Sequence, residues 1–103
     1  MKLYEKIKQY RLKMHLSQEY VAKYLGVNRA SFTQIELGKR KITADELASL
    51  ATLFGVSADS MLYDNSVQKP SVIFARNFEQ LDPDDQAEIV NLMRFKELMK
   101  AQR

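Results

Sequence analysis

The sequence contains no cysteine and a single histidine among its 103 residues. The lack of cysteine excludes disulfide bonds, thiolate metal sites and cysteine nucleophiles, and it fits the reducing environment of the cytoplasm. Only carboxylates could then hold a metal ion, and no acidic cluster in the sequence has the spacing of such a site. We therefore expect neither a metal nor any other cofactor.

Glycine and proline are also scarce, with three and two residues respectively. An all-β protein would need turn-forming residues every few positions, so this composition argues against one. No apolar run is long enough to span a membrane, and the N-terminus lacks the apolar stretch of a signal peptide. With 46% hydrophobic and 28% charged residues, the chain is expected to form one small globular domain with at most an appendage.

The net charge of +3 is unevenly distributed along the chain. Residues 1–62 contain 10 basic and 6 acidic residues, whereas residues 63–103 contain 6 and 7. The basic excess therefore lies wholly in the first part of the chain. Such an excess allows that part to bind a polyanion such as a nucleic acid.

Helix start and stop signals predict five short helices before residue 63. They span residues 3–14, 17–25, 28–37, 43–54 and 57–62. Three of them follow a residue that favours the N-cap position: Ser17, Asn28 and Thr43. Three of them end at a glycine: Gly26, Gly38 and Gly55. The apolar spacing in the second helix predicts four side chains in the core or at its edge: Tyr20, Val21, Tyr24 and Leu25.

The composition changes after residue 63. Residues 64–70 have the turn-forming composition of a linker. Ser71 is expected to cap a short helix. Asp82-Pro83, with an N-cap residue and then a proline at the first helical position, starts a further helix that is predicted to reach about Ala101. The predicted organisation is therefore a domain over residues 1–63, a linker over 64–70 and a helical extension over 71–103.

The second and third predicted helices are separated by a very short connection. Gly26 can adopt the positive φ that ends a helix sharply, and Val27 can fill the corner between the two helices. Ala22 is small enough to allow close contact between them. Two short helices around a tight turn form a helix-turn-helix.

The third predicted helix, residues 28–37, has two chemically different sides. At about 100° per residue, Phe32, Ile35 and Glu36 share one side. The other side carries Ala30, Thr33, Gln34 and Leu37. Asn28 and Arg29 sit at the N-terminal end of the helix. In the major groove of DNA, glutamine and asparagine can read adenine, and arginine can read guanine. An ordinary solvated helix face could have the same composition, but the preceding turn and the basic run that follows favour DNA binding.

The stretch from Ile7 to Leu62 resembles the Cro/C1-type (Xre-like, phage-repressor-type) helix-turn-helix family in continuous register. The resemblance is carried by Ser17-Gln18-Glu19, Val21-Ala22, Leu25-Gly26-Val27-Asn28, Ile35-Glu36-Leu37-Gly38-Lys39-Arg40, Leu47, Leu50-Ala51, Phe54-Gly55-Val56-Ser57 and Met61-Leu62. It implies an all-α fold with a five-helix domain that usually binds an operator as a dimer. His15 stands where the family usually has glycine, so we expect it to occupy a turn with positive φ.

The resemblance also implies roles for individual residues. Gln18 matches a position that commonly holds a backbone phosphate. The recognition-helix positions that approach bases or flanking phosphates fall on Asn28, Arg29, Ala30, Thr33 and Gln34. The loop positions that commonly follow the DNA backbone fall on Lys39, Arg40 and Lys41. Arg11 and Glu36 match an ion pair that links the first helix to the recognition helix, and we expect this pair to be structural.

The resemblance does not cover the C-terminal helix, which is rich in apolar residues. Ile89, Leu92 and Met99 form a stripe with the spacing of a helix–helix seam. Met93 and Phe95 lie beside that stripe and widen the apolar surface. The helix could pack back on its own domain, or it could hold a second subunit or a protein partner.

These features predict a sequence-specific, double-stranded-DNA-binding transcriptional regulator, a repressor of bacterial or phage origin acting as a homodimer in the cytoplasm. An enzyme is not expected, because no catalytic or phosphate-cradling motif is present. One alternative is an antitoxin or mobile-element repressor whose C-terminal segment binds a toxin or a protease. Another is a purely protein-binding helical module that leaves the basic face unused.

Overall fold

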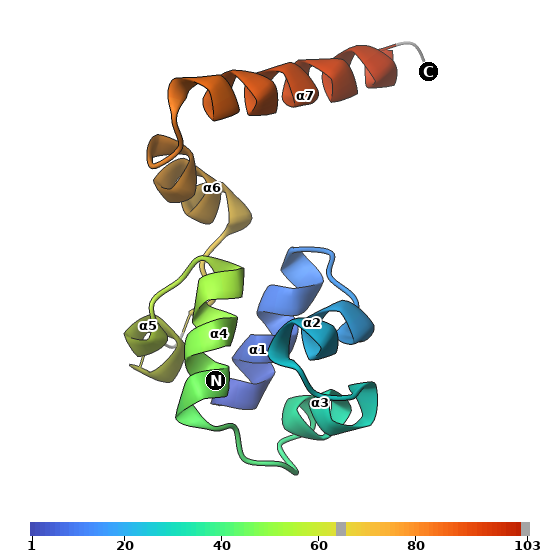
Figure 1. The fold of residues 1–103 in the computed structure, drawn as a ribbon, viewed down its shortest axis with the longest axis vertical. Coiled ribbons are helices and arrows are strands. Elements are labelled where there is room, and N and C mark those ends of the chain that lie inside the picture. The colour runs from blue at the N-terminus through green and yellow to red at the C-terminus, as the bar shows by residue number, and fades with distance from the viewer. Residues whose placement is uncertain (64–65, 102–103) are drawn as a thin grey trace. The chain divides into compact units, whose positions relative to one another are not determined.

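The computed structural model describes residues 1–63 and 66–101, and these residues form seven helices and no strand (Figure 1). The helices are α1 (Leu3–Lys13), α2 (Gln18–Leu25), α3 (Arg29–Glu36), α4 (Ala44–Phe54), α5 (Ala58–Tyr63), α6 (Pro70–Glu79) and α7 (Pro83–Ala101). They belong to two compact units, Met1–Ile73 and Phe74–Arg103. The predicted fold class, a five-helix all-α domain followed by a helical extension, is confirmed.

Helix boundaries in the first unit follow the capping residues. The side chains of Ser17, Asn28 and Thr43 accept hydrogen bonds from backbone N–H groups three residues later, at 3.0, 2.7 and 3.1 Å. Gly26 and Gly55 end α2 and α4 in the left-handed conformation, with φ of 75° and 70°. Each cap satisfies backbone groups that the helix itself leaves unpaired. The predicted starts and stops of these helices are therefore confirmed.

His15 and Ser71 test two finer expectations about local structure. His15 has a φ of 56°, the left-handed conformation expected for it in the turn after α1. Ser71 does not cap α6. The helix begins one residue earlier at Pro70, because proline fits the first helical position, where no N–H is required.

The core of the first unit draws on every helix from α1 to α5 and on the start of α6. Its buried apolar residues are Ile7, Tyr10, Val21, Ala22, Phe32, Ile35, Leu50, Ala51, Phe54, Val56, Met61 and Ile73. The rings of Tyr10 and Phe54 stack with their centroids 5.4 Å apart and join α1 to α4. Because α3 contributes Phe32 and Ile35, its position is fixed by the same core that holds α1 and α2.

The expectation that both tyrosines of α2 lie in the core or at its edge is wrong. Tyr20 and Tyr24 are exposed, whereas Val21 and Ala22 are buried and Leu25 is half-buried. The helix therefore turns its small and branched residues toward its neighbours. A helix of eight residues has room for only a narrow buried stripe.

The first unit extends past the predicted boundary at residue 63. Of the expected linker, residues 64 and 65 lie outside the described residues. In the rest, Val67 packs against the core and the backbone N–H of Gln68 donates to the Tyr10 hydroxyl at 3.2 Å. Ile73 is only 4% exposed. The division between the units consequently falls within α6.

Lys6 makes an unexpected contact between α1 and α5. Its side chain is 1% exposed, and its ammonium group donates to the carbonyls of Ser60 and Met61 at 3.2 and 3.0 Å. These carbonyls belong to the last turn of α5, where no further helical N–H can reach them. A buried charge thereby satisfies the end of a short helix.

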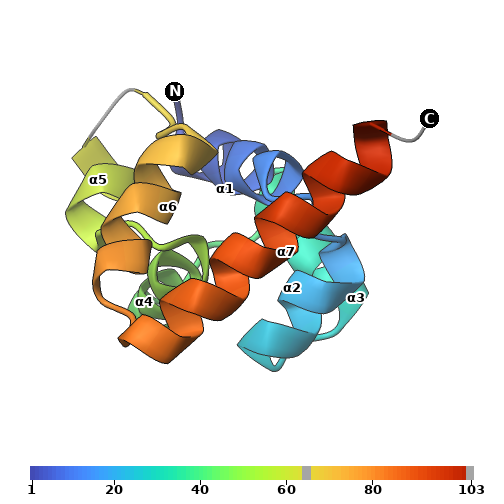
Figure 2. The same ribbon diagram turned by 90° about the horizontal axis from the view of Figure 1, so that it is seen from above.

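The second unit contains the rest of α6 and all of α7. The rings of Phe74 and Phe78 stack on α6, and the side chain of Gln86 donates to the Phe78 carbonyl at 2.8 Å. Figure 2 shows α7 as one continuous helix, which has 19 residues and no buried side chain. Among the described residues, no helix has the length and apolar character needed to cross a membrane.

Candidate nucleic-acid interface

The helices α2 and α3 lie side by side around the turn formed by residues 26–28 (Figures 1 and 2). The left-handed Gly26 reverses the chain, and the Val27 N–H closes the end of α2 by donating to the Ala22 carbonyl at 3.0 Å. The Val27 side chain packs against the core between the two helices. This is the helix-turn-helix arrangement that the sequence predicts.

The two sides of α3 differ in burial as expected. Phe32, Ile35 and Glu36 are buried. On the opposite side, Ala30, Gln34 and Leu37 are exposed and Thr33 is half-buried, while Arg29 is exposed at the N-terminal end of the helix. The side-chain oxygen of Asn28 caps the helix, so its amide NH₂ is the part that remains for another partner. The exposed side of α3 thus presents hydrogen-bonding groups on a helix whose other side is anchored in the core.

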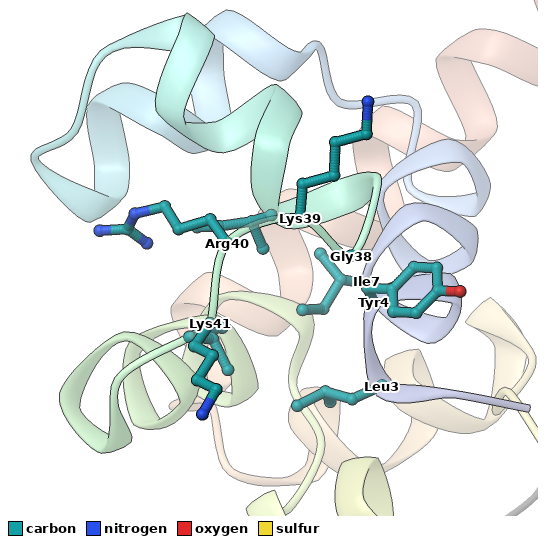
Figure 3. Close-up of a pocket in the computed structure, with 9 residues that line it drawn as sticks. Leu3, Tyr4, Ile7, Gly38, Lys39, Arg40 and Lys41 are labelled. Atoms are coloured by element: carbon teal, nitrogen blue, oxygen red, sulfur yellow. The ribbon is translucent and has the colours of Figure 1, made fainter.

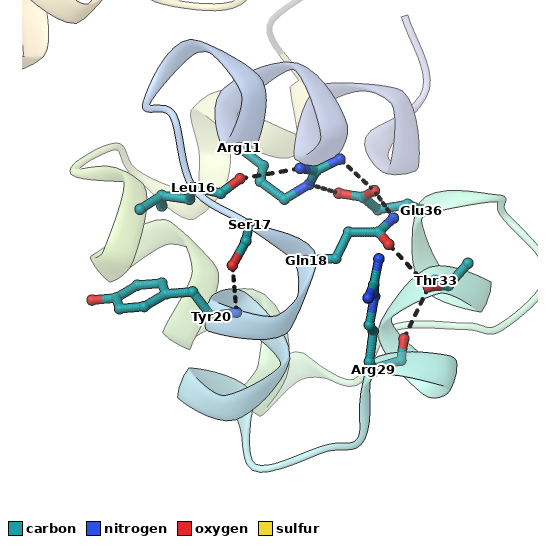
Figure 4. Close-up of polar contacts among 8 residues, drawn as sticks. All are labelled: Arg11, Leu16, Ser17, Gln18, Tyr20, Arg29, Thr33 and Glu36. Atoms are coloured by element: carbon teal, nitrogen blue, oxygen red, sulfur yellow. Dashed lines mark hydrogen bonds and ion pairs between the residues drawn. The ribbon is translucent and has the colours of Figure 1, made fainter.

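Arg11 and Glu36, expected to form an ion pair, make a two-point contact that joins α1 to α3 (Figure 4). Arg11 Nε lies 2.6 Å from Glu36 Oε2, and Arg11 Nη2 lies 3.1 Å from Glu36 Oε1. Their side chains are 11% and 3% exposed. Arg11 also donates to the Leu16 carbonyl at 3.1 Å, which ties the turn after α1 to the same pair. Two parallel hydrogen bonds of this kind fix the orientation of the two side chains as well as the distance between them.

Gln18 extends this network to α2, a role that sequence analysis missed. Its amide nitrogen donates to Glu36 Oε1 at 2.9 Å. The Thr33 hydroxyl lies 3.3 Å from the Gln18 carbonyl oxygen and 2.9 Å from the Arg29 carbonyl. A hydroxyl has a single proton, so these two contacts are alternatives. Gln18 therefore positions α3, and one amide proton remains for the expected phosphate contact.

The loop after α3 carries the three cations expected to follow the DNA backbone. Lys39 and Lys41 are exposed. Arg40 instead forms a two-point ion pair with Glu46, at 3.0 and 3.1 Å. The backbone N–H groups of Lys39 and Arg40 both donate to the Gln34 carbonyl, which ties the loop to the end of α3. Of the three side chains, the two lysines are therefore the ones without an ion pair among the described residues.

Glu46 also completes the capping box of α4. Its carboxylate accepts from the Thr43 N–H at 3.0 Å, while the Thr43 hydroxyl accepts from the Glu46 N–H. The hydrogen bond from Arg40, and after it the one from the Thr43 backbone, lower the pKa of Glu46. The hydrogen bond to Glu46 in turn raises the pKa of Arg40. The pairing thus ties the loop to the start of α4.

The lowered pKa of Glu46 predicts an acid-sensitive contribution to stability. A carboxyl group whose pKa is depressed by folding stabilises the protein above its unfolded pKa, about 4.3 for glutamate. This contribution is lost as the pH falls through the lower folded pKa. We expect the difference in free energy of unfolding between wild type and Glu46→Gln to be constant above about pH 5 and to shrink below it. Urea unfolding of both proteins at a series of pH values measures this difference in free energy. A difference that stays the same in acid would contradict the lowered pKa of Glu46.

The described residues contain no group of three or more acidic or histidine side chains that could hold a metal ion. The acidic run that precedes and begins α7 has a structural role. The backbone N–H of Asp85 donates to the Asp82 carboxylate at 2.9 Å, which caps the helix. The carboxylates at this helix start also lie at the positive end of the helix dipole.

Comparison with known proteins agrees with this geometry. The model of the helix-turn-helix family matches residues 7–60. The P22 c2 repressor, solved in complex with a synthetic operator, is 23% identical and has a TM-score of 0.58 over 63% of this chain and 98% of that one. A transcriptional regulator from Listeria innocua is 20% identical and has a TM-score of 0.58 over 95% and 94% of the two chains.

A hypothetical transcription factor from Neisseria, NHTF, is 22% identical and has a TM-score of 0.53 over 71% of this chain and 78% of that one. A search among curated proteins gives no match. At these identities the solved structures establish a shared fold. The family match covers more than half of the chain, from α1 to α5.

Proposed function

The chain belongs to the Cro/C1-type helix-turn-helix family, and we propose that it is a sequence-specific regulator of transcription that binds double-stranded DNA as a repressor. The observation that carries the proposal is the exposed side of α3. It presents Gln34 and the half-buried Thr33, and Arg29 is exposed at the start of the helix. The buried pair of Arg11 and Glu36 anchors the other side of α3 to the core. A helix that reads bases must be held at a fixed orientation, because base discrimination depends on two-point hydrogen bonds.

The loop after α3 and the start of α2 carry groups that can bind the phosphates of the DNA backbone. Lys39 and Lys41 are exposed in the loop directly after the helix, and no acid within residues 1–63 and 66–101 pairs with them. The start of α2 offers backbone N–H groups of its first turn and the remaining amide proton of Gln18. Contacts of this kind fix the register of a protein on the duplex, while base contacts provide specificity. A regulator of bacterial or phage genes would do this in the cytoplasm.

Selection of bound duplexes from a random-sequence pool, followed by sequencing, tests the proposal. We expect a defined half-site and an affinity that falls steeply with salt concentration, because phosphate contacts release counterions. Recovery of unselected sequence would remove the claim of specificity. Absence of any duplex binding at low salt would overturn the proposal and favour a purely protein-binding helical module.

We further propose that α7 holds two copies of the chain together. Its large apolar side chains are not buried, and Leu92 and Phe95 are 56% and 59% exposed. The other members of the expected contact surface are Ile89, Met93 and Met99. Exposed apolar surface of this extent is typical of an interaction site. A two-fold dimer would also allow two copies of α3 to enter successive major grooves about 34 Å apart.

Charged substitutions in α7 test the dimer. We expect the wild-type chain to sediment as a dimer at micromolar concentration and Leu92→Glu/Met99→Glu to sediment as a monomer, because buried unpaired carboxylates oppose association. Both positions are exposed, so the substitutions should leave the fold of the chain intact. Leu12→Glu/Tyr20→Glu, which adds the same charge at two exposed positions of the first unit, is the matched control. A monomeric wild type, with and without DNA, would contradict the dimer.

The distribution of apolar residues around α7 favours a second candidate function. Val90 and Leu98 are exposed and lie away from the stripe of Ile89, Leu92 and Met99. The apolar surface is thus wider than contact with one helix requires. An antitoxin or mobile-element repressor would use the additional surface for a toxin or a protease. The variant Val90→Glu/Leu98→Glu separates partner binding from dimerisation. If this role is correct, the variant still dimerises but no longer copurifies with a toxin or a protease.

A further inference from the structure

A pocket of about 350 Å³ opens between the first turns of α1 and the loop that follows α3 (Figure 3). Its lining residues are Leu3, Tyr4, Ile7, Ile35, Gly38, Lys39, Arg40, Lys41 and Ile42. This volume lies at the small end of the roughly 300–1,000 Å³ range of ligand pockets in proteins. The pocket is separate from the exposed side of α3, but it shares the loop that carries Lys39 and Lys41.

The interior of this pocket is apolar and firmly supported. Ile7 and Ile35 belong to the buried core, and Leu3 and Ile42 pack against it. The ring of Tyr4 lies against the backbone of Gly38, where an added Cβ would come within 2.8 Å of the ring. Gly38 also has a φ of 75°, so the residue at this position is constrained both by its conformation and by the ring. The pocket is therefore formed by residues that the fold holds in place.

The charged residues around the pocket all have the same sign. Among the described residues that line it, three are basic and none is acidic. Glu46 neutralises Arg40, whereas no described acid pairs with Lys39 or Lys41. In Figure 3 the two lysine side chains extend from the loop in different directions, and their flexible stems allow either ammonium group to turn toward a ligand. An apolar interior with a cationic rim matches a molecule that has an apolar body and one negative charge.

We propose that this pocket binds a small amphipathic carboxylate, aliphatic or aromatic, and that its occupancy weakens binding to DNA. The regulatory part rests on the proposed function, because it assumes that Lys39 and Lys41 contact phosphates. A carboxylate at the rim competes with DNA for these two charges. Ligand and DNA then lower each other's affinity by the same factor, as linkage requires.

Octanoate is a suitable probe of the binding step, which requires no DNA. The full chain is titrated with octanoate, and the methyl and amide NMR signals are followed. We expect saturable shifts at Leu3, Ile7, Ile35 and Ile42. Octylamine, with the opposite charge, and acetate, without the apolar tail, should cause no such shifts.

Substitution of Lys39 and Lys41 tests whether positive charge at the rim of the pocket contributes to octanoate binding. Lys39→Gln/Lys41→Gln should weaken octanoate binding by about threefold to tenfold, because each exposed charge contributes modestly. The variants are expected to fold normally, since both side chains are exposed. Lys13→Gln, which removes an exposed charge at the other end of α1, should leave the affinity unchanged. Octanoate shifts confined to α7, or equal binding of octylamine, would overturn the proposed site.

The regulatory step is measured with the duplex recovered by selection. Octanoate should lower the affinity of the full chain for this duplex, and acetate at the same concentration should not. Octanoate that saturates the pocket without changing DNA affinity would overturn the coupling. If no duplex binds at all, the proposed function fails, while the NMR titration still decides whether the pocket takes the carboxylate.

Discussion

Replacing Arg11 by Met is expected to lower the free energy of unfolding of the first unit by about 3–5 kcal/mol. The substitution keeps most of the side-chain volume but leaves the Glu36 carboxylate, only 3% exposed, without its cation. It also removes the donor to the Leu16 carbonyl. Urea unfolding followed by tyrosine fluorescence reports this unit specifically, because all five tyrosines lie within residues 1–63.

The ion pair between Arg40 and Glu46 provides a matched control for this result. Arg40→Met removes the same kind of side chain from a two-point contact with Glu46, but Arg40 is far more exposed than Arg11. We expect a much smaller loss of stability, because exposed pairs are well solvated when broken. The double variant Arg11→Met/Glu36→Leu should recover much of the stability lost in Arg11→Met, since no unpaired charge remains buried. Equal losses for Arg11→Met and Arg40→Met would show that burial of the pair has no effect.

Replacing Arg29 or Gln34 by Ala is expected to cost about 1–3 kcal/mol of binding free energy on the selected DNA site. This corresponds to a loss of affinity of about 5- to 150-fold. Both residues are exposed on α3, so the loss should reflect missing base contacts and leave folding unaffected. Competition binding with the selected site and with single-base variants measures the affinity and the base that each residue reads.

A lysine in the loop after α3 is the appropriate comparison for these two residues. Lys39→Gln should weaken binding to all sequences alike and reduce the magnitude of the salt slope by about 1. Lys100→Gln, which makes the same charge change near the end of α7, should leave the salt slope unaltered. If Arg29→Ala and Gln34→Ala reduced binding equally on the selected site and on random DNA, neither residue would have a role in specificity.

Local interactions explain why the helices themselves could be predicted from the sequence. Ser17, Asn28 and Thr43 each bond to a backbone N–H only three residues away, so the start of a helix is encoded within one turn. Gly26 and Gly55 end helices through their own backbone conformation. The periodicity of α3 likewise assigned its buried and exposed sides, because one helix has a fixed angle per residue. The resemblance to the Cro/C1-type family then joined these elements into one fold.

Ion pairs and side-chain hydrogen bonds between helices were predicted only where that resemblance supplied them. The pair of Arg11 and Glu36 was expected from it, whereas the third partner, Gln18, was not. Periodicity also failed for α2, whose tyrosines were expected in the core or at its edge although both are exposed. A pattern of apolar residues indicates that a helix has a buried side, but only the neighbouring helices determine how wide that side is.

The sequence by itself thus determined where the helices of the first unit begin and end and which side of α3 faces the core. Tertiary structure decided the polar contacts between helices, both in the core and at the candidate site. Lys6 reaches carbonyls 54 and 55 positions away, and Gln18 reaches Glu36 across 18 positions. Tertiary structure also decided that Arg40 is neutralised by Glu46, while Lys39 and Lys41, beside an apolar pocket, have no ion pair in the part of the chain that the structure describes. The physical reason is range: a cap acts within one helical turn, whereas these contacts exist only after the core has fixed each helix against the others.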